Sequence, residues 1–202
     1  DLTRGELGTR GSADLRDQEA ARAAEILGVD FRVNLGFRDG FIANDEEHQL
    51  EVIRMIRLYR PEVVICNAIH DRHTDHGKSS KLVSDSCFLS GLQRIETEFD
   101  GVLQQAWRPR AVYHYIQDRY IQPDFVVDIT IFRQKKMDAI LAFSSQFYNP
   151  ASDEPQTAIS SQTFLQFIEG RMLEFGRQAG FDYGEGFTVE RYPGVKSVFD
   201  LY

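Results

Sequence analysis

Three of the five histidines of the chain lie within seven residues, at His70, His73 and His76, and two aspartates, Asp71 and Asp75, lie among them. Neutral imidazole and carboxylate are ligands that zinc and other first-row divalent metals accept. His73 and His76 are three residues apart, so both rings can enter one pocket, whereas nothing fixes His70 relative to them. The pattern predicts a histidine–carboxylate site, and a solvated polar loop is the alternative interpretation.

The residues on either side of this cluster predict a strand followed by a helix. Val63–Cys66 is an unbroken apolar run after Pro61, which is typical of a strand buried on both faces of a parallel sheet. A helical pattern begins near Gly77, with Leu82 and Leu89 on one stripe. The cluster is therefore expected at the carboxyl end of a strand, where open α/β sheets bind ligands.

Composition excludes several classes of protein. The chain has 202 residues, of which 42% are hydrophobic and 27% charged, and a net charge of −8, as in a globular domain. It lacks a basic stripe for nucleic acid and an apolar run of about 18 residues for a membrane helix. Cys66 and Cys87 are predicted to be reduced core thiols of a cytoplasmic protein. The chain starts at Asp1 without Met, and we expect residues before it to be missing.

Patterns elsewhere in the chain predict the remaining elements. Helices are predicted over 12–27, 45–59, 130–142 and 161–178, and strands over 30–35, 111–116, 125–129 and 184–192. The order helix, strand, helix, strand, helix in the first half indicates an α/β fold, with a Rossmann-like, mostly parallel sheet and helices on both faces. No internal repeat or linker is visible, so a single domain over residues 1–202 is expected.

Two charged residues outside the cluster are further candidates. Arg16 lies on the apolar stripe of the first predicted helix, next to the glycine-rich segment 1–13. A buried charge needs a partner, so Arg16 is expected either to pair with a carboxylate or to reach into a pocket. Asp39 follows the predicted strand 30–35, where an acid can hold a sugar hydroxyl. As a turn residue before Gly40 it would need no function.

With these residues in view, the chain resembles the zinc-dependent N-deacetylases of the PIG-L / LmbE-like family. It is most similar to the branch that deacetylates N-acetylglucosaminyl-malate in bacillithiol biosynthesis. The resemblance covers nearly the whole chain and is carried by residues 1–6, 8–11, Arg16, Glu19, 34–35, Asp39, 60–61, 71–76, 123–125, 145–147 and 185–187.

The chain departs from the family pattern at two places. Thr74 stands where the family usually has proline. The family's His-x-Asp-Asp motif, which supplies two metal ligands and the catalytic base, would precede Asp1. The resemblance therefore implies a deacetylase domain that lacks its first strand and the metal-binding loop upstream of Asp1, and we expect truncation.

The resemblance also implies a role for each candidate residue of the cluster. His76 is expected to bind Zn²⁺ or another divalent metal. His73 is expected to stabilise the tetrahedral oxyanion or protonate the leaving amine, and Asp75 to hold the His73 ring and keep it cationic. As substrate-binding residues, the resemblance indicates Arg16 and Asp39 for the sugar hydroxyls.

Two further arginines are also candidates for substrate binding. Arg72 and Arg110 are expected either to bind a substrate carboxylate or to pair with Asp75. The implied activity is hydrolysis of the acetamide of an N-acetylglucosamine conjugate by a cytoplasmic homo-oligomer, a hexamer by resemblance. The alternatives are a deacetylase of another N-acetyl amino sugar, such as a chitin-derived disaccharide, and a metal-free sugar-binding or assembly subunit of the same fold.

Overall fold

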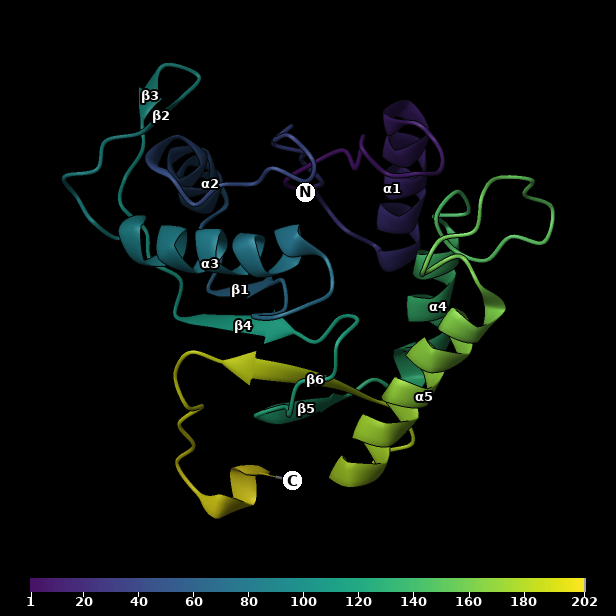
Figure 1. The fold of residues 1–202 in the computed structure, drawn as a ribbon. Coiled ribbons are helices and arrows are strands. Elements are labelled where there is room, and N and C mark those ends of the chain that lie inside the picture. Colours follow the sequence, from purple (N-terminus) through teal and green to yellow (C-terminus); the bar gives the residue numbers. More distant parts are fainter. Residues whose placement is uncertain (202) are drawn as a thin grey trace. The chain divides into compact units, whose positions relative to one another are not determined.

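The computed structural model describes residues 1–201, which form two compact units (Figure 1). Unit 1 consists of residues 1–42 and 126–185, and unit 2 of residues 43–125 and those from 186 onward. Each unit is thus built from two segments that are far apart in the sequence. The expectation of a single domain over residues 1–202 stays a prediction.

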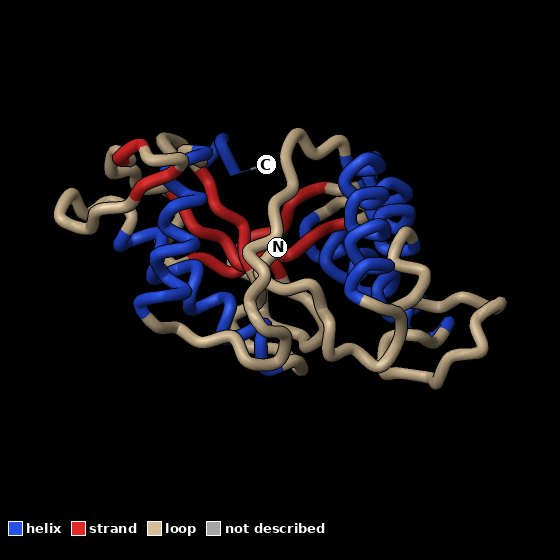
Figure 2. Tube along the Cα trace, turned by 90° about the horizontal axis from the view of Figure 1, so that it is seen from above, coloured by secondary structure: helices blue, strands red, loops and turns tan. Residues whose placement is uncertain are grey.

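Unit 1 is mainly helical. Its elements are α1 (Ala13–Leu27), the 3-10 turn η1 (Thr130–Phe132), α4 (Arg133–Leu141) and α5 (Gln162–Ala179). Helix α1 packs against α4, and the helices of this unit lie together on the right of both Figure 1 and Figure 2, where helices are blue. The buried side chains of Ile129, Met137 and Met172 form a core cluster beneath them.

The ends of these helices follow from capping residues. The Ser12 hydroxyl accepts a hydrogen bond from the backbone N–H of Leu15 at 3.2 Å, and Gly28 ends α1 in the left-handed conformation with φ 74°. Ser161 and Gly180 cap α5 in the same way. Hydroxyl N-caps and glycine C-caps are strong sequence signals, and the predicted helices 12–27 and 161–178 are confirmed.

The predicted strand over residues 30–35 is wrong. This segment is extended, and its end is hydrogen-bonded to the chain start, from the N–H of Leu35 to the carbonyl of Asp1 (2.9 Å) and from Phe37 to Leu2 (2.8 Å). The alternation that suggested a strand is real, but the pairing with the chain start amounts to one isolated parallel bridge, between Thr3 and Phe37.

Unit 2 contains two long helices and most of the sheet. Its elements are α2 (Glu46–Tyr59), β1 (Val63–Cys66), α3 (Thr74–Leu89), β2 (Glu98–Phe99), β3 (Val102–Leu103), β4 (Ala111–Tyr115) and the turn η2 (Val198–Leu201). Strands β5 (Phe125–Asp128) and β6 (Gly184–Val189) contribute residues to both units. Helices α2 and α3 pack against each other, and α3 also contacts β1 and β4 (Figure 1).

The main sheet is mixed. Its strand order is β1-β4-β6-β5, with β4 parallel to β1 and antiparallel to β6. A mixed sheet flanked by helices confirms the predicted α/β fold class. The antiparallel β6 was not specified by the sequence pattern, because a strand's direction depends on the path of the chain before it.

Strand β1 is less buried than predicted. Val63 is 47% and Ile65 56% exposed, whereas Cys66 is buried. The prediction of a strand buried on both faces is wrong, because β1 is the edge strand of this sheet and α3 packs against it. Cys66 and Cys87 are both buried and free, and burial raises the pKa of each thiol to about 12, which fits the predicted core thiols.

A short hairpin of β2 and β3 was not predicted. The two strands pair antiparallel across Asp100 and Gly101, which have φ angles of 49° and 74°. An Asp-Gly pair with two left-handed residues is the usual two-residue hairpin turn. The signal was therefore present in the sequence, but the flanking strands are only two residues long and carry no clear alternation.

Candidate functional site

The histidine cluster forms the start of helix α3. The helix begins at Thr74, three residues earlier than predicted, so His76 lies in its first turn. His73 is the N-cap residue, and its Nδ1 accepts the backbone N–H of Asp75 at 3.3 Å. A ring nitrogen that accepts a hydrogen bond carries no proton, so the neutral ring has its proton on Nε2. The spacing of the motif is thus the spacing of a helix start.

His76 is oriented by Asp71. Its Nδ1 lies 2.5 Å from Oδ2 of Asp71, whose side chain is fully buried. The other oxygen of Asp71, Oδ1, accepts the backbone N–H groups of Asp118 (3.1 Å) and Arg119 (2.8 Å). Because the carboxylate accepts at Nδ1, the neutral ring keeps a lone pair on Nε2. Nε2 can therefore take a proton or ligate a cation.

The ionisation of Asp71 reflects these contacts. Burial opposes the charged form, but the N–H of Arg119 and the His76 ring outweigh it and lower the pKa of Asp71 below its usual value. Asp71 belongs to the predicted cluster, but sequence reasoning assigned it no role of its own. Its role could not be read from the local sequence, because it depends on contacts with Asp118 and Arg119, which follow β4 in the chain.

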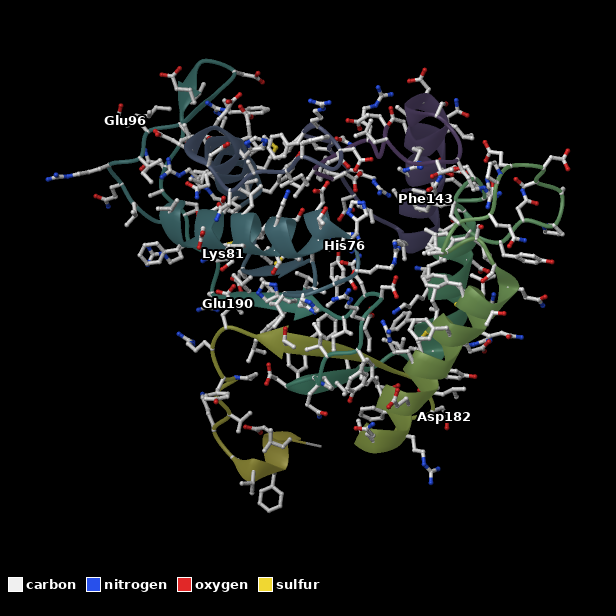
Figure 3. The ribbon with its side chains drawn as sticks, viewed as in Figure 1. His76, Lys81, Glu96, Phe143, Asp182 and Glu190 are labelled. Atoms are coloured by element: carbon white, nitrogen blue, oxygen red, sulfur yellow. The ribbon has the colours of Figure 1, made fainter. Side chains whose placement is uncertain are left out.

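The two histidine rings lie close together, as their spacing predicted. Their centroids are 5.1 Å apart with an angle of 35° between the ring planes, and Figure 3 labels His76 at the start of α3. Asp75 is 4% exposed, and its described contact with His73 uses its backbone N–H. The predicted roles of the Asp75 carboxylate and of a cationic His73 stay predictions.

The two arginine candidates of unit 2, Arg72 and Arg110, lie at opposite edges of the sheet. Nε of Arg72 pairs with Oδ2 of Asp118 at 2.5 Å, beside the histidines. Arg110 precedes β4 and pairs with Glu62 at 3.4 Å, with its side chain 80% exposed. Because β1 and β4 are parallel, Arg110 lies at the amino edge of the sheet and the histidines follow the carboxyl edge. The structure thus separates Arg110 from the histidines, and its contact with a substrate carboxylate stays a prediction.

In unit 1, Arg16 lies against the glycine-rich loop. Its Nη2 donates to the carbonyl of Arg10 at 2.9 Å. A Cβ atom on Gly5 or Gly8 would lie 2.1 Å from the guanidinium, so these glycines leave the space that Arg16 occupies. Burial lowers the pKa of Arg16, and the charges of Asp39 and Glu19 oppose this shift.

Asp39 holds the same loop from the other side. Its Oδ2 accepts the N–H of Leu7 at 3.1 Å, and its own N–H donates to Oε1 of Glu6 at 2.8 Å. Arg16 and Asp39 thus both border the segment between Gly5 and Gly8. The structure brings these two predicted substrate-binding residues to one loop, and their contact with a sugar stays a prediction.

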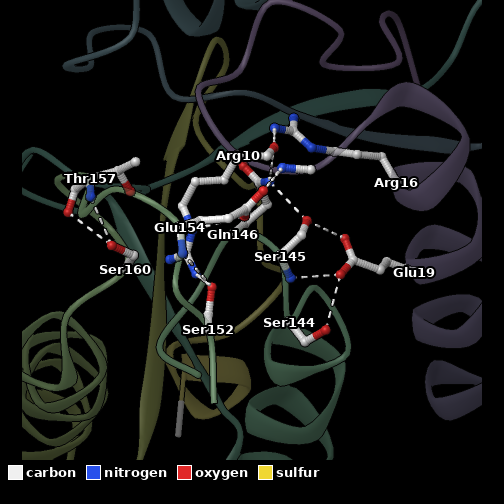
Figure 4. A network of polar contacts seen from close by, with 11 residues as sticks. Arg10, Arg16, Glu19, Ser144, Ser145, Gln146, Ser152, Glu154, Thr157 and Ser160 are labelled. Carbon is white, nitrogen blue, oxygen red and sulfur yellow. Dashed lines mark hydrogen bonds and ion pairs between the residues drawn. The ribbon is translucent and has the colours of Figure 1, made fainter. Parts of the chain in front are cut away.

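A buried polar network fixes this loop (Figure 4). The Glu19 carboxylate accepts the N–H and the hydroxyl of Ser145, both at 2.7 Å. Arg10 is 4% exposed and pairs with Glu154 at 3.3 Å, and Oε1 of Glu154 also accepts the N–H of Gly11 at 3.0 Å. These contacts join residues that are 126 to 144 positions apart in the chain, which rigidifies the loop that borders Arg16.

The candidate residues divide between the two units. The histidine group belongs to unit 2, and the loop with Arg16 and Asp39 belongs to unit 1. Within residues 1–201, no group of three or more His, Cys, Asp or Glu side chains comes together that could hold a metal ion. The described residues therefore do not form a complete zinc site, and the prediction that His76 binds zinc stays a prediction.

Several known proteins are similar to this chain over most of its length. The conserved protein TT1542 from Thermus thermophilus is 32% identical, with a TM-score of 0.83 over 98% of this chain and 82% of that chain. The family model PIG-L, described as GlcNAc-PI de-N-acetylase, matches residues 1–87, which include the Arg16 loop and the histidine cluster. The chain belongs to the PIG-L family.

Two other proteins show what this fold accommodates. Diacetylchitobiose deacetylase of Thermococcus kodakarensis is 26% identical over 196 residues, which are 96% of this PIG-L family chain and 68% of that protein. GalB, the 4-carboxy-2-hydroxymuconate hydratase from Pseudomonas putida, is 19% identical, with a TM-score of 0.73 over 92% of this chain and 75% of that chain. The second likeness concerns the fold alone, so the fold does not decide the reaction.

None of the helices within residues 1–201 combines the length and apolarity that crossing a membrane requires.

Proposed function

We propose that this PIG-L family protein hydrolyses the acetamide of an N-acetylglucosamine conjugate and releases acetate and the free amino sugar. The observation that carries the proposal is the pair of imidazoles at the start of α3 with opposite hydrogen-bonding roles. Family membership and the deacetylase among the relatives support the same reaction.

Amide hydrolysis needs a proton acceptor for water, a donor for the oxyanion and a proton for the leaving amine. His73, with Nδ1 accepting a backbone N–H, offers Nε2–H as a donor to the oxyanion or the amine. His76, with Nδ1 held by Asp71, offers the Nε2 lone pair. Asp75 is proposed to support His73, and Arg16 and Asp39 to bind the sugar hydroxyls, with Arg72 as a further candidate for a substrate carboxylate.

Zinc dependence remains part of the proposal and rests on the family resemblance and on Nε2 of His76. Bound zinc would polarise the acetamide carbonyl and make its water more acidic. Within residues 1–201, His76 is not joined by two further ligands that would complete such a site. Metal content measured by mass spectrometry should fall in His76→Ala and stay unchanged in His73→Ala. Equal metal content in both variants would contradict the role of His76.

The reaction is tested by following acetate and free amine from N-acetylglucosaminyl-malate, using the complete gene product. His73→Ala should lower turnover by about 10²–10⁴-fold, the usual effect of losing a proton-transfer group. His48→Gln, in the first turn of α2 and outside the histidine cluster, is the control and should keep full activity. If no N-acetyl sugar releases amine but sugars still bind, the proposal of an enzyme is overturned, and the protein is a sugar-binding subunit.

The finer question is the aglycone. N-acetylglucosaminyl-malate is the substrate that the resemblance favours, and diacetylchitobiose is the one named for the curated relative. We propose the malate conjugate, since Arg72 lies beside the histidines and can bind a carboxylate. A higher kcat/KM for diacetylchitobiose than for the malate conjugate would overturn this choice.

A further inference from the structure

Arg119 brings a guanidinium to the histidine cluster from the segment that follows β4. Its backbone N–H donates to Oδ1 of Asp71 at 2.8 Å, and its Nη1 lies 3.0 Å from Nε2 of His70. The main chain and the tip of this residue therefore contact two consecutive residues of unit 2. Because both contacts hold it, the Arg119 side chain lies against the segment that leads to His73 and His76.

Most of the Arg119 guanidinium is available to a ligand. A guanidinium has five N–H donors and no acceptor, so Arg119 donates in its contact with Nε2 of His70. Arg119 is exposed, and within residues 1–201 its side chain has no hydrogen-bond or ion-pair partner other than His70. Its positive charge is therefore not offset by a carboxylate in direct contact, and its remaining N–H groups can bind an acceptor.

Arg72, the candidate for a substrate carboxylate, differs from Arg119 in this respect. Its Nε pairs with Oδ2 of Asp118 at 2.5 Å, so an acid offsets part of its charge. The pairs Arg72–Asp118 and His70–Arg119 join the same two segments, so both guanidinium groups come from one pair of adjoining segments. Arg119 is then the residue of these two whose charge is open to a ligand.

The acids of the cluster do not cancel this charge at the surface. The side chain of Asp71 is fully buried and bound to His76 and two backbone N–H groups. Asp75 is 4% exposed and lies in the first turn of α3, where the helix dipole stabilises an acid. The Asp118 side chain is 25% exposed, and that of Arg72 is 44% exposed. The charges of this group that solvent reaches are therefore mainly those of the two arginines, which favours an anionic ligand.

We propose that Arg119 is a substrate-binding residue whose guanidinium takes a carboxylate of the aglycone. Guanidinium and carboxylate form charge-assisted and often bidentate hydrogen bonds. The inference rests on the proposed function, in which the aglycone is malate. Malate joined through its hydroxyl keeps two carboxylates, so Arg72 and Arg119 can bind one each. Arg119 then decides how strongly an aglycone with two carboxylates is preferred to an aglycone with one.

The test compares three N-acetylglucosamine conjugates with the complete gene product: the malyl conjugate with two carboxylates, the lactyl conjugate with one and the methyl glycoside with none. Arg119→Gln should raise KM for the malyl conjugate about 10–100-fold, the effect of losing a hydrogen-bonded charge, with kcat nearly unchanged. The preference for the malyl over the lactyl conjugate should disappear, and kcat/KM for the methyl glycoside should not change. Arg94→Gln, at an exposed arginine of the same unit, is the control and should alter none of these values.

A second variant separates substrate binding from an indirect effect through His70. His70→Ala removes the contact with Arg119 and keeps its charge, so the preference for the malyl conjugate over the methyl glycoside should persist. Loss of this preference in His70→Ala would mean that Arg119 only positions the cluster. An equal fall of kcat/KM for all three conjugates in Arg119→Gln would mean the same, and an unchanged KM for the malyl conjugate would also overturn the proposal.

Failure of the proposed reaction gives a different result from failure of this assignment. If no conjugate releases amine, calorimetric titration with N-acetylglucosaminyl-malate measures the same contact, and Arg119→Gln should raise Kd by the same factor relative to Arg94→Gln. A raised Kd without amine release counts against the reaction alone. Equal Kd values, or amine release at equal kcat/KM from all three conjugates, overturn the role of Arg119 alone, and no binding by the unchanged protein overturns both.

Discussion

At the scale of single residues, Asp71 links the His76 ring to the segment that follows β4. One oxygen holds His76 and the other holds two backbone N–H groups from the segment after β4. Asp71→Asn keeps the shape but offers only one accepting oxygen. If the deacetylase proposal is correct, kcat/KM should fall by about 10–100-fold, as for other groups that orient a functional histidine. The pH dependence of kcat/KM distinguishes this role from a purely structural one. In Asp71→Asn the shape of the pH profile should change, whereas a structural defect would lower kcat/KM equally at every pH.

The same residue predicts a pH dependence of stability. The pKa of Asp71 is lowered in the folded protein, so its contribution is present above the unfolded value of about 3.9 and is lost as the pH falls through the folded value. The free energy of unfolding of Asp71→Asn should therefore lie below that of the unchanged protein by about 2 kcal/mol at pH 7, and the gap should narrow below about pH 4. Urea titrations at both pH values measure it, and a constant gap would contradict the assignment.

Gly8 predicts a separate effect on substrate binding. A Cβ at this position would lie 2.1 Å from Nη2 of Arg16, the end of a flexible side chain, and the φ angle of Gly8 is not positive. Gly8→Ala should therefore displace Arg16 with little loss of stability. KM should rise about tenfold if Arg16 hydrogen-bonds the sugar, with kcat nearly unchanged. Gly28→Asn, at the exposed end of α1, is the control for altering a glycine in this unit.

The residue types and spacing of the cluster were sufficient to predict two adjacent imidazoles. They were not sufficient to predict Asp71 as the residue that orients His76, because the contacts that bury Asp71 come from residues 118 and 119. They also gave no sign that Arg110 and the histidines lie at opposite edges of the sheet, because this depends on the directions of β1 and β4.

At the scale of elements, α5 and the start of β6 approach unusually closely. A Cβ on Gly176 would lie 2.8 Å from backbone atoms of Tyr183, and backbone cannot move aside as a side chain can. Gly176→Ala should lower the free energy of unfolding by about 1–3 kcal/mol through overpacking. Gly170→Ala, in the same helix with nothing within 4 Å, should instead raise it by about 0.5–1 kcal/mol.

Thermal and urea unfolding of the two variants check this contrast. Equal effects of both substitutions would mean that helix propensity, and not the contact of α5 with β6, decides the outcome. The elements also differ in how well the local sequence predicts them. Caps such as Ser12 and Gly28 act within a few residues and were predicted correctly, whereas the strand over 30–35 depended on a partner far away in the chain and was not.

At the scale of the whole molecule, the chain passes between the two units three times, and two of these passages lie within strands β5 and β6. Unfolding of either unit therefore removes residues from a strand of the other. The only tryptophan, Trp107, lies in unit 2 and donates its indole N–H to the carbonyl of Pro61 at 2.8 Å. It reports on unit 2 alone.

Gly176→Ala, in unit 1, should therefore shift the midpoint of the Trp107 fluorescence transition as far as that of the helical circular dichroism. A fluorescence midpoint that stays in place while the circular dichroism changes would show that the units unfold separately. The sequence predicted the α/β class correctly because hydrophobic periodicity is local. It carried no sign of the two-unit organisation, because each unit combines two segments that are far apart in the sequence.

The interleaved path of the chain has a practical outcome for anyone dividing this protein. A single protease cut after Phe125 would leave one fragment with residues 1–42 of unit 1 and most of unit 2, and another with the remainder of both. Neither fragment would contain the complete hydrophobic core of either unit. Any activity regained on mixing them would have to come from mutual complementation, with the halves of both units folding onto each other.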